Sequence, residues 1–381
     1  MRSRAAVLWA VGEDWKVEDV ELDPPKAGEV LVKMGAAGLC HSDEHLVTGD
    51  LGVTPEMIEL GVPPMVPVVG GHEGAGVVVE VGAGVKGVAP GDHVAASFVP
   101  ACGQCRWCVT GRSALCDLGM STFGPGMITD GTHRLHIRGQ DINTMAKLGT
   151  FAEHMVVSEA SLVKIDPHIG LSVAALVSCG VATGWGSAVH RAEVAPGETV
   201  VVVGVGGIGM NAVQGARMAG AKYVVAVDTA EFKRKSALDF GATHVAESMA
   251  EALPLVVELT AGQLAEKVIM APSVMYGDLL AGGMALTGKD GTLVVTAVAP
   301  MAQMDVSLSL FELAMWNKQI KGVIFGSGNP RFDIPNLLSL YSAGQLKLDE
   351  LITRTYSLDQ INEGYQDMRD GKNIRGVIVF D

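Results

Sequence analysis

The chain is poor in positive charge: it carries only 28 Lys and Arg against 42 Asp and Glu, which gives a net charge of −14. A surface that neutralises nucleic-acid phosphates needs the opposite balance, so we expect no nucleic-acid partner. Charged residues of both signs make up only 18% of the chain, and no run of like charges indicates a tail or a membrane-surface helix. The 48% apolar fraction instead indicates a large buried interior.

We also expect no export signal. The first apolar stretch of the sequence, Ala5 to Ala10, is too short for a signal peptide, and no cleavage site follows it. One segment, Ile169 to Val189, runs for 21 residues without a formal charge, which is long enough on paper to span a bilayer. Its many glycine and serine residues favour a buried core helix. We therefore expect a cytoplasmic protein with no membrane partner.

Cysteine is scarce, with six in 381 residues, and in an unexported chain this indicates metal ligands or buried thiols and not disulfides. Four follow the pattern Cys-x2-Cys-x2-Cys-x7-Cys, in which short gaps let a turning backbone point several thiolates at one tetrahedral ion: Cys102, Cys105, Cys108 and Cys116. Four sulfurs leave no open coordination position. The pattern therefore predicts a structural zinc in a lobe from about residue 98 to residue 120, since iron–sulfur clusters usually have other spacings.

The two remaining cysteines point to a second metal site. Cys40 opens the segment Cys-His-Ser-Asp-Glu-His, His72 follows 32 residues later in Gly-His-Glu-Gly, and Cys179 lies far along the chain. Two sulfurs and one imidazole form a three-ligand site whose fourth position is open to water or substrate, as in a catalytic zinc. Each residue alone would more often be an ordinary core residue, but the three together favour zinc over magnesium or calcium.

A length of 381 residues suggests two domains, and the hydrophobic pattern changes along the chain. The first third has short alternating segments between turn signals, which predicts a mainly β, barrel-like unit with strands at Val17 to Leu22, Glu29 to Ala37, Gly74 to Val81 and His93 to Phe98. From about Ser172, strands and helices alternate, which predicts an α/β domain with a doubly wound parallel sheet. Its predicted elements are strands Thr199 to Val203, Tyr223 to Val227 and Thr292 to Val298, and helices Ile208 to Ala219 and Phe232 to Phe240. The chain ends with a helix, Ile334 to Ser342, and a strand, Gly376 to Phe380.

A Gly-x-Gly-x-x-Gly fingerprint directly follows the predicted strand Thr199 to Val203 and opens the next helix. Its residues are Gly204, Gly206, Gly207, Ile208 and Gly209. Glycines there permit a tight turn and let the backbone approach a pyrophosphate at the helix N-terminus. Asp228 ends the next strand, 24 residues after Gly204, where a carboxylate can accept ribose hydroxyls and repel a 2′-phosphate. This arrangement predicts NAD, while three nearby cations, Lys233, Arg234 and Lys235, leave NADP open.

Taken together, these motifs resemble those of the zinc-dependent medium-chain alcohol dehydrogenases over essentially the whole chain. The resemblance rests on the four-cysteine lobe and on the segments GLCHSDEHLVTGD, GGHEGAGVV, SCGVATGWGSAV, GVGGIG and GKNIRGVIV, in the family's order. Within the family, the chain most resembles the actinobacterial branch that depends on nitrosodimethylaniline (NDMA), some of whose members are nicotinoproteins that hold NAD without releasing it. The resemblance implies a GroES-like catalytic domain of residues 1–180 and 326–381, with a Rossmann NAD-binding domain of residues 181–325 between them.

The resemblance also implies a role for single residues. Zinc at Cys40, His72 and Cys179 is supported by the carboxylates of Asp43 and Glu73, Ser42 receives the alcohol proton, and His45 is the outer end of the proton relay. The implied cofactor contacts are His41 and Arg375 to the pyrophosphate, Lys233 to the adenosine ribose, and Thr183 and Ile208 to the nicotinamide. Phe98 resembles a wall of the substrate pocket.

The implied function is hydride transfer between a primary alcohol or aldehyde and NAD, with two zinc ions per chain, in a homodimer or homotetramer. An alternative is a thiol-dependent formaldehyde dehydrogenase of the mycothiol type. The glutathione-dependent branch has an acidic residue and an arginine at pocket positions where this chain has Leu51 and Met120. These two differences argue against dependence on glutathione. A non-enzymatic nucleotide-binding protein or a zinc-free quinone reductase would be expected to lose catalytic ligands, and none is lost here.

Overall fold

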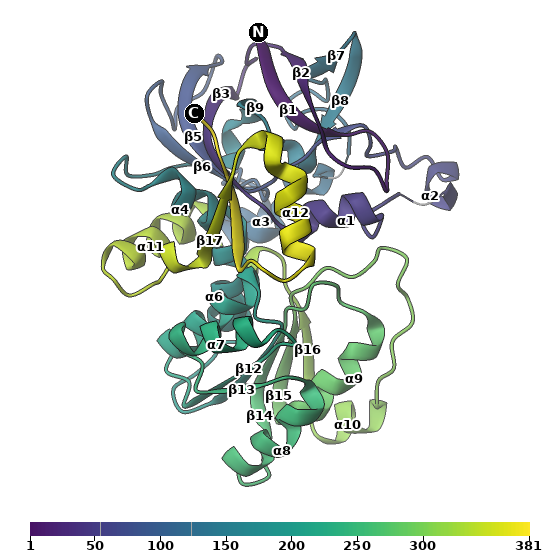
Figure 1. The fold of residues 1–381 in the computed structure, drawn as a ribbon, viewed down its shortest axis with the longest axis vertical. Coiled ribbons are helices and arrows are strands. Elements are labelled where there is room, and N and C mark those ends of the chain that lie inside the picture. The colour runs from purple at the N-terminus through teal and green to yellow at the C-terminus, as the bar shows by residue number, and fades with distance from the viewer. Residues whose placement is uncertain (54, 123) are drawn as a thin grey trace. The chain divides into compact units, whose positions relative to one another are not determined.

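The computed structural model describes residues 1–53, 55–122 and 124–381. The chain folds into two compact units, Met1–Cys179 with Asn329–Asp381, and Gly180–Gly328. The first unit contains both ends of the chain, drawn in purple and in yellow (Figure 1).

The first unit contains a small closed β-barrel. Its strands, in spatial order, are β1 (Arg2–Leu8), β2 (Lys16–Leu22), β7 (Leu135–Ile137), β8 (Gln140–Thr144) and β4 (Val68–Val69). Along β2, Val20 and Leu22 point into the barrel core while Glu21 between them is exposed, as the period of two in a strand requires. The predicted barrel-like unit is thus present, and its first strand, β1, is one that the sequence pattern did not indicate.

A second sheet of the first unit carries most of the predicted early strands. Its strands are β10 (Leu162–Lys164), β6 (His93–Ala96), β5 (Gly74–Val81), β3 (Glu29–Gly38), β18 (Arg375–Val379) and β17 (Ile352–Tyr356), with β9 (His154–Ser158) also paired to β3. The last strand, β18, runs antiparallel to β3 with Val377 opposite Gly38. This pairing attaches the C-terminal segment to the first unit.

The described part of this unit contains six α-helices: α1 (His41–Thr48), α2 (Pro55–Glu59), α3 (Arg106–Val109), α4 (Leu171–Leu176), α11 (Pro330–Ser342) and α12 (Ile361–Arg369). Helix α11 begins four residues before the predicted Ile334, because Asn329 caps it and Pro330 fits the first helical position. Helix α1 follows Cys40 directly. It therefore carries the residues that the sequence assigned to the proton path.

The second unit is built on a six-stranded parallel sheet. The strand order is β13 (His244–Ala246), β12 (Tyr223–Val227), β11 (Thr199–Val203), β14 (Ala265–Met270), β15 (Thr287–Val295) and β16 (Gln319–Gly322). In chain order this is 3-2-1-4-5-6, the arrangement of a dinucleotide-binding sheet, so the predicted doubly wound fold is confirmed. Strand β15 starts at Thr287 and ends at Val295, whereas Thr292 to Val298 was expected, because an irregular first part carries Gly288 and Gly291.

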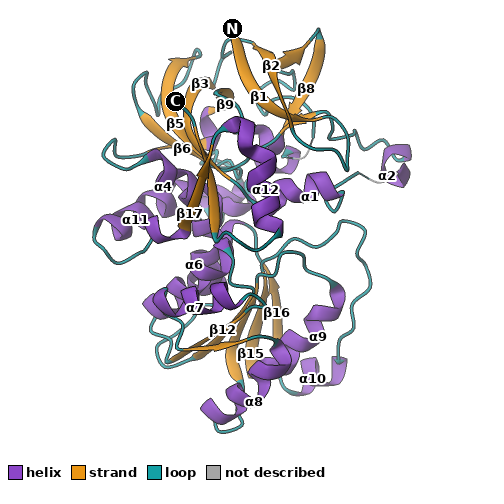
Figure 2. Ribbon diagram, viewed as in Figure 1, coloured by secondary structure: helices purple, strands orange, loops and turns teal. Residues whose placement is uncertain are grey.

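Helices flank this sheet, as Figure 2 shows in purple beside the orange strands. They are α5 (Ala182–Gly186), α6 (Gly207–Met218), α7 (Glu231–Asp239), α8 (Met249–Leu259), α9 (Gly277–Leu286) and α10 (Leu310–Met315). Helix α6 packs against β11, and residues of α8 and α9 share a core cluster with Val201 and Val203. The strand at the sheet centre is therefore fully buried, as its continuous apolar run predicted.

The apolar segment predicted at Ile169 to Val189 forms a helical segment, Leu171–Arg191. Its turns alternate between α and π geometry. Among the described residues it alone is long and apolar enough to cross a membrane, and 89% of its most apolar window is buried inside the protein. Such burial is what a core helix shows.

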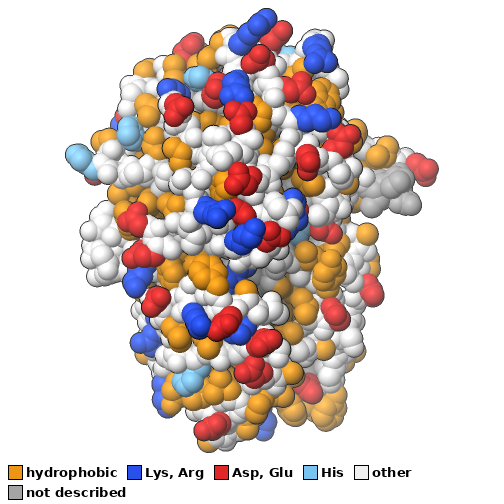
Figure 3. Space-filling model, in the orientation of Figure 1, with side chains coloured by type: hydrophobic (Ala, Val, Ile, Leu, Met, Phe, Trp, Pro, Cys, Tyr) orange, Lys and Arg blue, Asp and Glu red, His pale blue; other side chains and the backbone are white. Residues whose placement is uncertain are grey.

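On the face seen in Figure 3, Lys and Arg side chains lie among Asp and Glu side chains.

Candidate metal and cofactor sites

Three segments far apart in the sequence meet in a buried cluster of the first unit. Cys40 lies just before α1, His72 lies between β4 and β5, and Cys179 lies in the π turn that follows α4. The metal-binding atoms of these three residues and of Glu73 all lie within 4.8 Å of one another. Cys179 Sγ is 3.5 Å from His72 Nε2. The structure thus brings together the three predicted zinc ligands.

Asp43 orients the histidine of this cluster. Its side chain is fully buried; Oδ2 lies 2.9 Å from Nδ1 of His72, and Oδ1 accepts the N–H of Gly71 at 2.7 Å. A carboxylate at Nδ1 keeps the proton on that nitrogen and leaves the Nε2 lone pair for a metal. Asp43 therefore selects the tautomer that a zinc ligand needs.

The donor set fits a divalent zinc ion. A hydrogen bond from the Cys179 thiol lowers the pKa of Cys40 well below its usual range, and the same bond and burial raise the pKa of Cys179. The two thiols thus share one proton in a buried site. Both thiols would be deprotonated with a thiophilic cation in place, because a coordinating thiol binds as the thiolate. Buried sulfurs and an imidazole exclude magnesium and calcium, which prefer oxygen ligands.

Glu73 is the buried carboxylate beside this cluster, and its partner is Arg375 of β18. Burial raises the pKa of Glu73 to about 7, although the positive charge of Arg375 opposes that rise. The resemblance gave Arg375 a pyrophosphate contact. In the structure its side chain is buried and donates to Glu73. Sequence reasoning missed this pairing because the two residues are 302 positions apart.

Two hydroxyl groups fix the loop that carries His72 and Glu73. The Thr150 hydroxyl donates to the Glu73 carbonyl at 2.8 Å, and the Ser178 hydroxyl accepts the N–H of Gly74 at 3.1 Å. Both are fully buried. Ser178 precedes the ligand Cys179, so its hydrogen bond ties two of the three ligand segments together. Neither residue was among the candidates from sequence.

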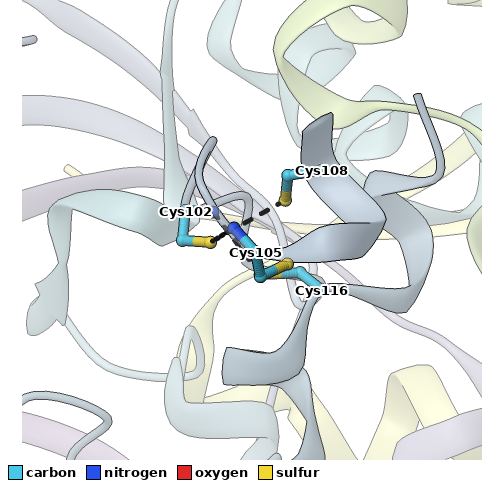
Figure 4. Close-up of side chains that lie close together, drawn as sticks. All are labelled: Cys102, Cys105, Cys108 and Cys116. Atoms are coloured by element: carbon cyan, nitrogen blue, oxygen red, sulfur yellow. Dashed lines mark hydrogen bonds between the residues drawn. The ribbon is translucent and has the colours of Figure 1, made fainter. Parts of the chain in front are cut away.

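The four other cysteines converge in the predicted lobe (Figure 4). Cys102 Sγ lies 3.9 Å from Cys108 Sγ, and Cys105 Sγ lies 4.0 Å from Cys116 Sγ. A tetrahedral site with Zn–S bonds of about 2.3 Å has sulfur–sulfur edges of about 3.8 Å. All six cysteines are free thiols. The spacing therefore matches a closed four-sulfur zinc site and not a pair of disulfides.

The predicted proton-path residues lie on α1. Ser42 Oγ is 3.8 Å from Cys40 Sγ, so its hydroxyl adjoins the metal cluster. His45 is buried, with Nδ1 3.0 Å from Asp50 Oδ2, and the His41 ring lies 6.5 Å from its ring. Asp50 was not among the residues predicted from sequence. The signal that could have found it is its position five residues after His45, past a helix-ending glycine.

The predicted pocket residues differ in their surroundings. The Phe98 ring packs edge-on against the His72 ring, with centroids 5.6 Å apart. Leu51 is buried behind α1, and its N–H donates to the His45 carbonyl. The Met120 side chain is 89% exposed. The structure thus places Phe98 beside the metal cluster and turns Met120 to solvent.

The glycine fingerprint of the second unit has the geometry of a phosphate cradle. Gly204 has φ +83°, and a Cβ there would lie 2.4 Å from the Ala271 carbonyl oxygen. A Cβ on Gly209 would lie 1.9 Å from the Gly204 carbonyl oxygen. A Cβ on Gly206, by contrast, meets nothing within 4 Å, so packing alone does not require glycine there. A pyrophosphate approaching the start of α6 is the group that would require it.

Asp228 directly follows β12 and hydrogen-bonds to the same loop. Its Oδ2 accepts the N–H of Val205 at 3.0 Å and its Oδ1 accepts the N–H of Ala230 at 2.9 Å. Of the three nearby cations, Arg234 donates to the carbonyls of residues 228 and 229, and Lys235 pairs with Glu231. Ile208 lies in the first turn of α6 beside Gly207. The buried Thr183 hydroxyl has no hydrogen-bond partner within the described residues.

Two family models match the chain: the alcohol dehydrogenase GroES-like domain over residues 26–167 and the zinc-binding dehydrogenase domain over residues 207–343. Alcohol dehydrogenase B of Mycobacterium tuberculosis is 49% identical over 382 residues, covering 100% of this chain and 99% of the relative. The NDMA-dependent alcohol dehydrogenase of Amycolatopsis methanolica is 50% identical over 379 residues, with the same coverage. Among solved structures, benzyl alcohol dehydrogenase of Acinetobacter calcoaceticus matches with a TM-score of 0.88 at 28% identity over 100% of both chains.

Proposed function

The chain belongs to the zinc-binding alcohol dehydrogenase family, and from this premise we propose that it oxidises primary alcohols to aldehydes, with a catalytic zinc at Cys40, His72 and Cys179 and an NAD that stays bound between turnovers. It is an alcohol dehydrogenase that uses zinc and NAD. The observation that carries the site assignment is the buried cluster whose metal-binding atoms lie within 4.8 Å of one another. When bound, zinc lowers the pKa of an alcohol hydroxyl and NAD accepts the hydride.

The residues around this cluster support a path for the alcohol proton. The Ser42 hydroxyl adjoins Cys40 Sγ at 3.8 Å and takes the proton from the alcohol, while His45, on the same helix, carries it onward. Asp43 holds His72 in the tautomer that binds metal. The Phe98 ring, packed against His72, forms an apolar wall for the carbon chain of the substrate.

A second zinc would be held by Cys102, Cys105, Cys108 and Cys116. Four thiolates fill the coordination sphere, so this ion stabilises the lobe and takes no part in the reaction. Metal analysis of the purified protein tests this assignment. Two zinc ions per chain are expected, and one ion per chain would contradict it.

The open space above Gly206 and the carboxylate of Asp228 support NAD as the preferred dinucleotide. A 2′-phosphate beside Asp228 would meet a negative charge, and Arg234, which could offset it, is held by two backbone carbonyls. His41, Thr183, Ile208, Lys233 and Arg375 remain proposed cofactor contacts.

Retention of NAD is proposed because a relative that is 50% identical is named for dependence on NDMA, an acceptor that can reoxidise a bound cofactor. The test is to gel-filter the protein, extract it with denaturant, and assay oxidation of ethanol and benzyl alcohol with NDMA and no added NAD. One NAD per chain and turnover without added NAD are expected. Cofactor-free protein that needs millimolar NAD would reject retention and leave an ordinary NAD-dependent enzyme. A thiol-dependent activity receives no support from Leu51 or Met120, which carry no charge for a thiol adduct.

We also propose a cytoplasmic homo-oligomer, a dimer or tetramer. Strand β16 is an edge of its sheet, paired only to β15 within the described residues. Six apolar side chains in the segment that precedes β16 in the sequence are exposed: Met301, Met304, Val306, Leu310, Phe311 and Met315. A sheet edge and exposed apolar side chains in one unit favour association with a second copy. Sedimentation analysis tests this, and a monomer at micromolar concentration would contradict it.

A further inference from the structure

The carboxylate of Asp50 lies against the outer nitrogen of the relay histidine. Asp50 Oδ2 is 3.0 Å from Nδ1 of His45 and accepts the Thr48 hydroxyl at 2.7 Å. The two side chains differ in exposure: His45 is 3% exposed and Asp50 is 21% exposed. Along this line of contacts, Asp50 is therefore the group that meets water.

The end of α1 produces this contact. Gly49 adopts the left-handed conformation with φ +85° and ends the helix after Thr48. The Leu51 N–H then donates to the His45 carbonyl at 3.0 Å, which folds the next turn back over the histidine. A helix-ending turn needs no carboxylate at this position, so the contact between Asp50 and His45 needs an explanation of its own.

We propose that Asp50 is the positioning residue and the outer proton acceptor for His45. This inference rests on the proposed function, in which His45 receives the proton of the alcohol. Because Asp50 accepts from Nδ1, the ring carries its proton there and presents Nε2 as the acceptor. When Nε2 takes a proton, the Nδ1 proton passes to Asp50 Oδ2 and then to water, which restores the carboxylate and leaves the ring with its proton on Nε2. The starting tautomer returns when Nε2 gives up that proton and Nδ1 takes one from water through Asp50.

Asp50 is a carboxylate in direct contact with His45, and the neighbouring acidic groups of α1 have other partners. Elsewhere on α1, Asp43 faces His72 and Glu44 pairs with Arg369 at 2.7 Å, while the His41 ring lies 6.5 Å from the His45 ring. Burial would raise the pKa of Asp50, but hydrogen bonds with Thr48 and His45 lower it below its ordinary value. Asp50 is therefore ionised at neutral pH, so it accepts the hydrogen bond of Nδ1–H and releases to water any proton that it takes.

The test measures the single-turnover rate of NADH formation from an alcohol on the holoenzyme. Asp50→Ala should lower this rate at least tenfold, by analogy with the loss of about 10- to 100-fold when the outer partner of a metal-bound histidine is removed. Added formate should restore part of the loss, and Asp50→Glu should retain more activity than Asp50→Ala. In a His45→Gln background, Asp50→Ala should cause no further loss. Asp14→Asn, which removes an exposed carboxylate elsewhere, is the charge-matched control.

A second readout does not depend on activity. The ¹⁵N shifts of labelled histidine, with the His45 signals assigned by His45→Gln, should show Nδ1–H in the wild type and a changed tautomer in Asp50→Ala. A wild-type rate in Asp50→Ala, a loss that formate does not restore, or an unchanged tautomer would overturn the inference. If the wild-type holoenzyme oxidises no alcohol, the proposed function fails instead, and the tautomer still decides whether Asp50 orients His45.

Discussion

Both carboxylate oxygens of Asp43 contact the loop that carries His72. Oδ2 lies 2.9 Å from Nδ1 of His72, and Oδ1 accepts the Gly71 N–H at 2.7 Å. The first contact sets the tautomer of the histidine and the second sets the backbone that carries it. Burying a carboxylate is unfavourable unless it is paired, so this arrangement is stable only when both contacts are made. The geometry of His72, the proposed ligand of the catalytic metal, thus depends on a residue that is not itself a proposed ligand.

Asp43→Asn should therefore weaken zinc binding at the Cys40, His72 and Cys179 cluster by about 10- to 100-fold. An amide can donate to Nδ1 and so select the wrong tautomer, in which Nε2 carries the proton. Competition with a chelator, followed by metal analysis, measures the loss of the weaker ion. The four-cysteine site should keep its zinc in this variant. Equal chelator sensitivity of Asp43→Asn and wild type would contradict the orienting role.

The two metal sites should respond differently to loss of one ligand. Cys105→Ser removes one sulfur of the proposed structural zinc site, so it should mainly lower the melting temperature. His72→Ala should abolish turnover while the fold keeps much of its stability. Thermal denaturation and alcohol oxidation of both variants give the comparison. An active His72→Ala enzyme, or a Cys105→Ser variant with unchanged stability, would refute the separation of roles.

Local sequence pattern predicted the elements that depend on local order. Strands Gly74–Val81, Thr199–Val203 and Tyr223–Val227 lie where their apolar patterns place them. The pattern did not indicate short barrel strands such as Leu135–Ile137, because three residues hold too little periodicity. Helix α8 was also missed, and it contains Pro254, which normally argues against a helix interior.

The residues of the candidate sites also fall into two groups: those in local motifs, which the sequence predicted, and those joined by tertiary contacts, which it did not. Cys102 to Cys116 could be recognised because their spacing is local, and the glycine fingerprint because it joins a strand to a helix. The pairing of Glu73 with Arg375 depends on β18 joining β3 across the whole chain. The contact of Asp50 with His45 depends on a turn whose direction Gly49 sets. Such contacts follow from tertiary structure and leave no periodic signal.

Cofactor preference should change when the Asp228 carboxylate is removed. Asp228→Ala should raise the ratio of kcat/KM for NADP over NAD at least tenfold, because the charge that repels a 2′-phosphate is lost. Steady-state kinetics with both cofactors on protein stripped of bound nucleotide measure this ratio.

Asp228 also accepts two backbone N–H groups, so the Asp228→Ala variant should lose about 1–3 kcal/mol of stability. Asp228→Asn separates the two effects, since its amide oxygen can still accept one of these bonds. A wild-type enzyme that binds NADP as tightly as NAD would show that Asp228 does not select the cofactor.

Two glycines of the fingerprint should respond in opposite ways to an added methyl group. Gly206→Ala places its Cβ in open space, so the free energy of unfolding should stay within about 0.5 kcal/mol of wild type. If a pyrophosphate lies there, the same methyl group should raise the dissociation constant for NAD at least tenfold, which corresponds to about 1.4 kcal/mol.

Gly209→Ala is the matched control. Its Cβ would lie 1.9 Å from the Gly204 carbonyl oxygen, so this substitution should destabilise the fold by about 1–3 kcal/mol. Urea denaturation and NAD titration of both stripped variants give the four values. A Gly206→Ala protein that binds NAD as tightly as wild type would show that the pyrophosphate does not approach this glycine.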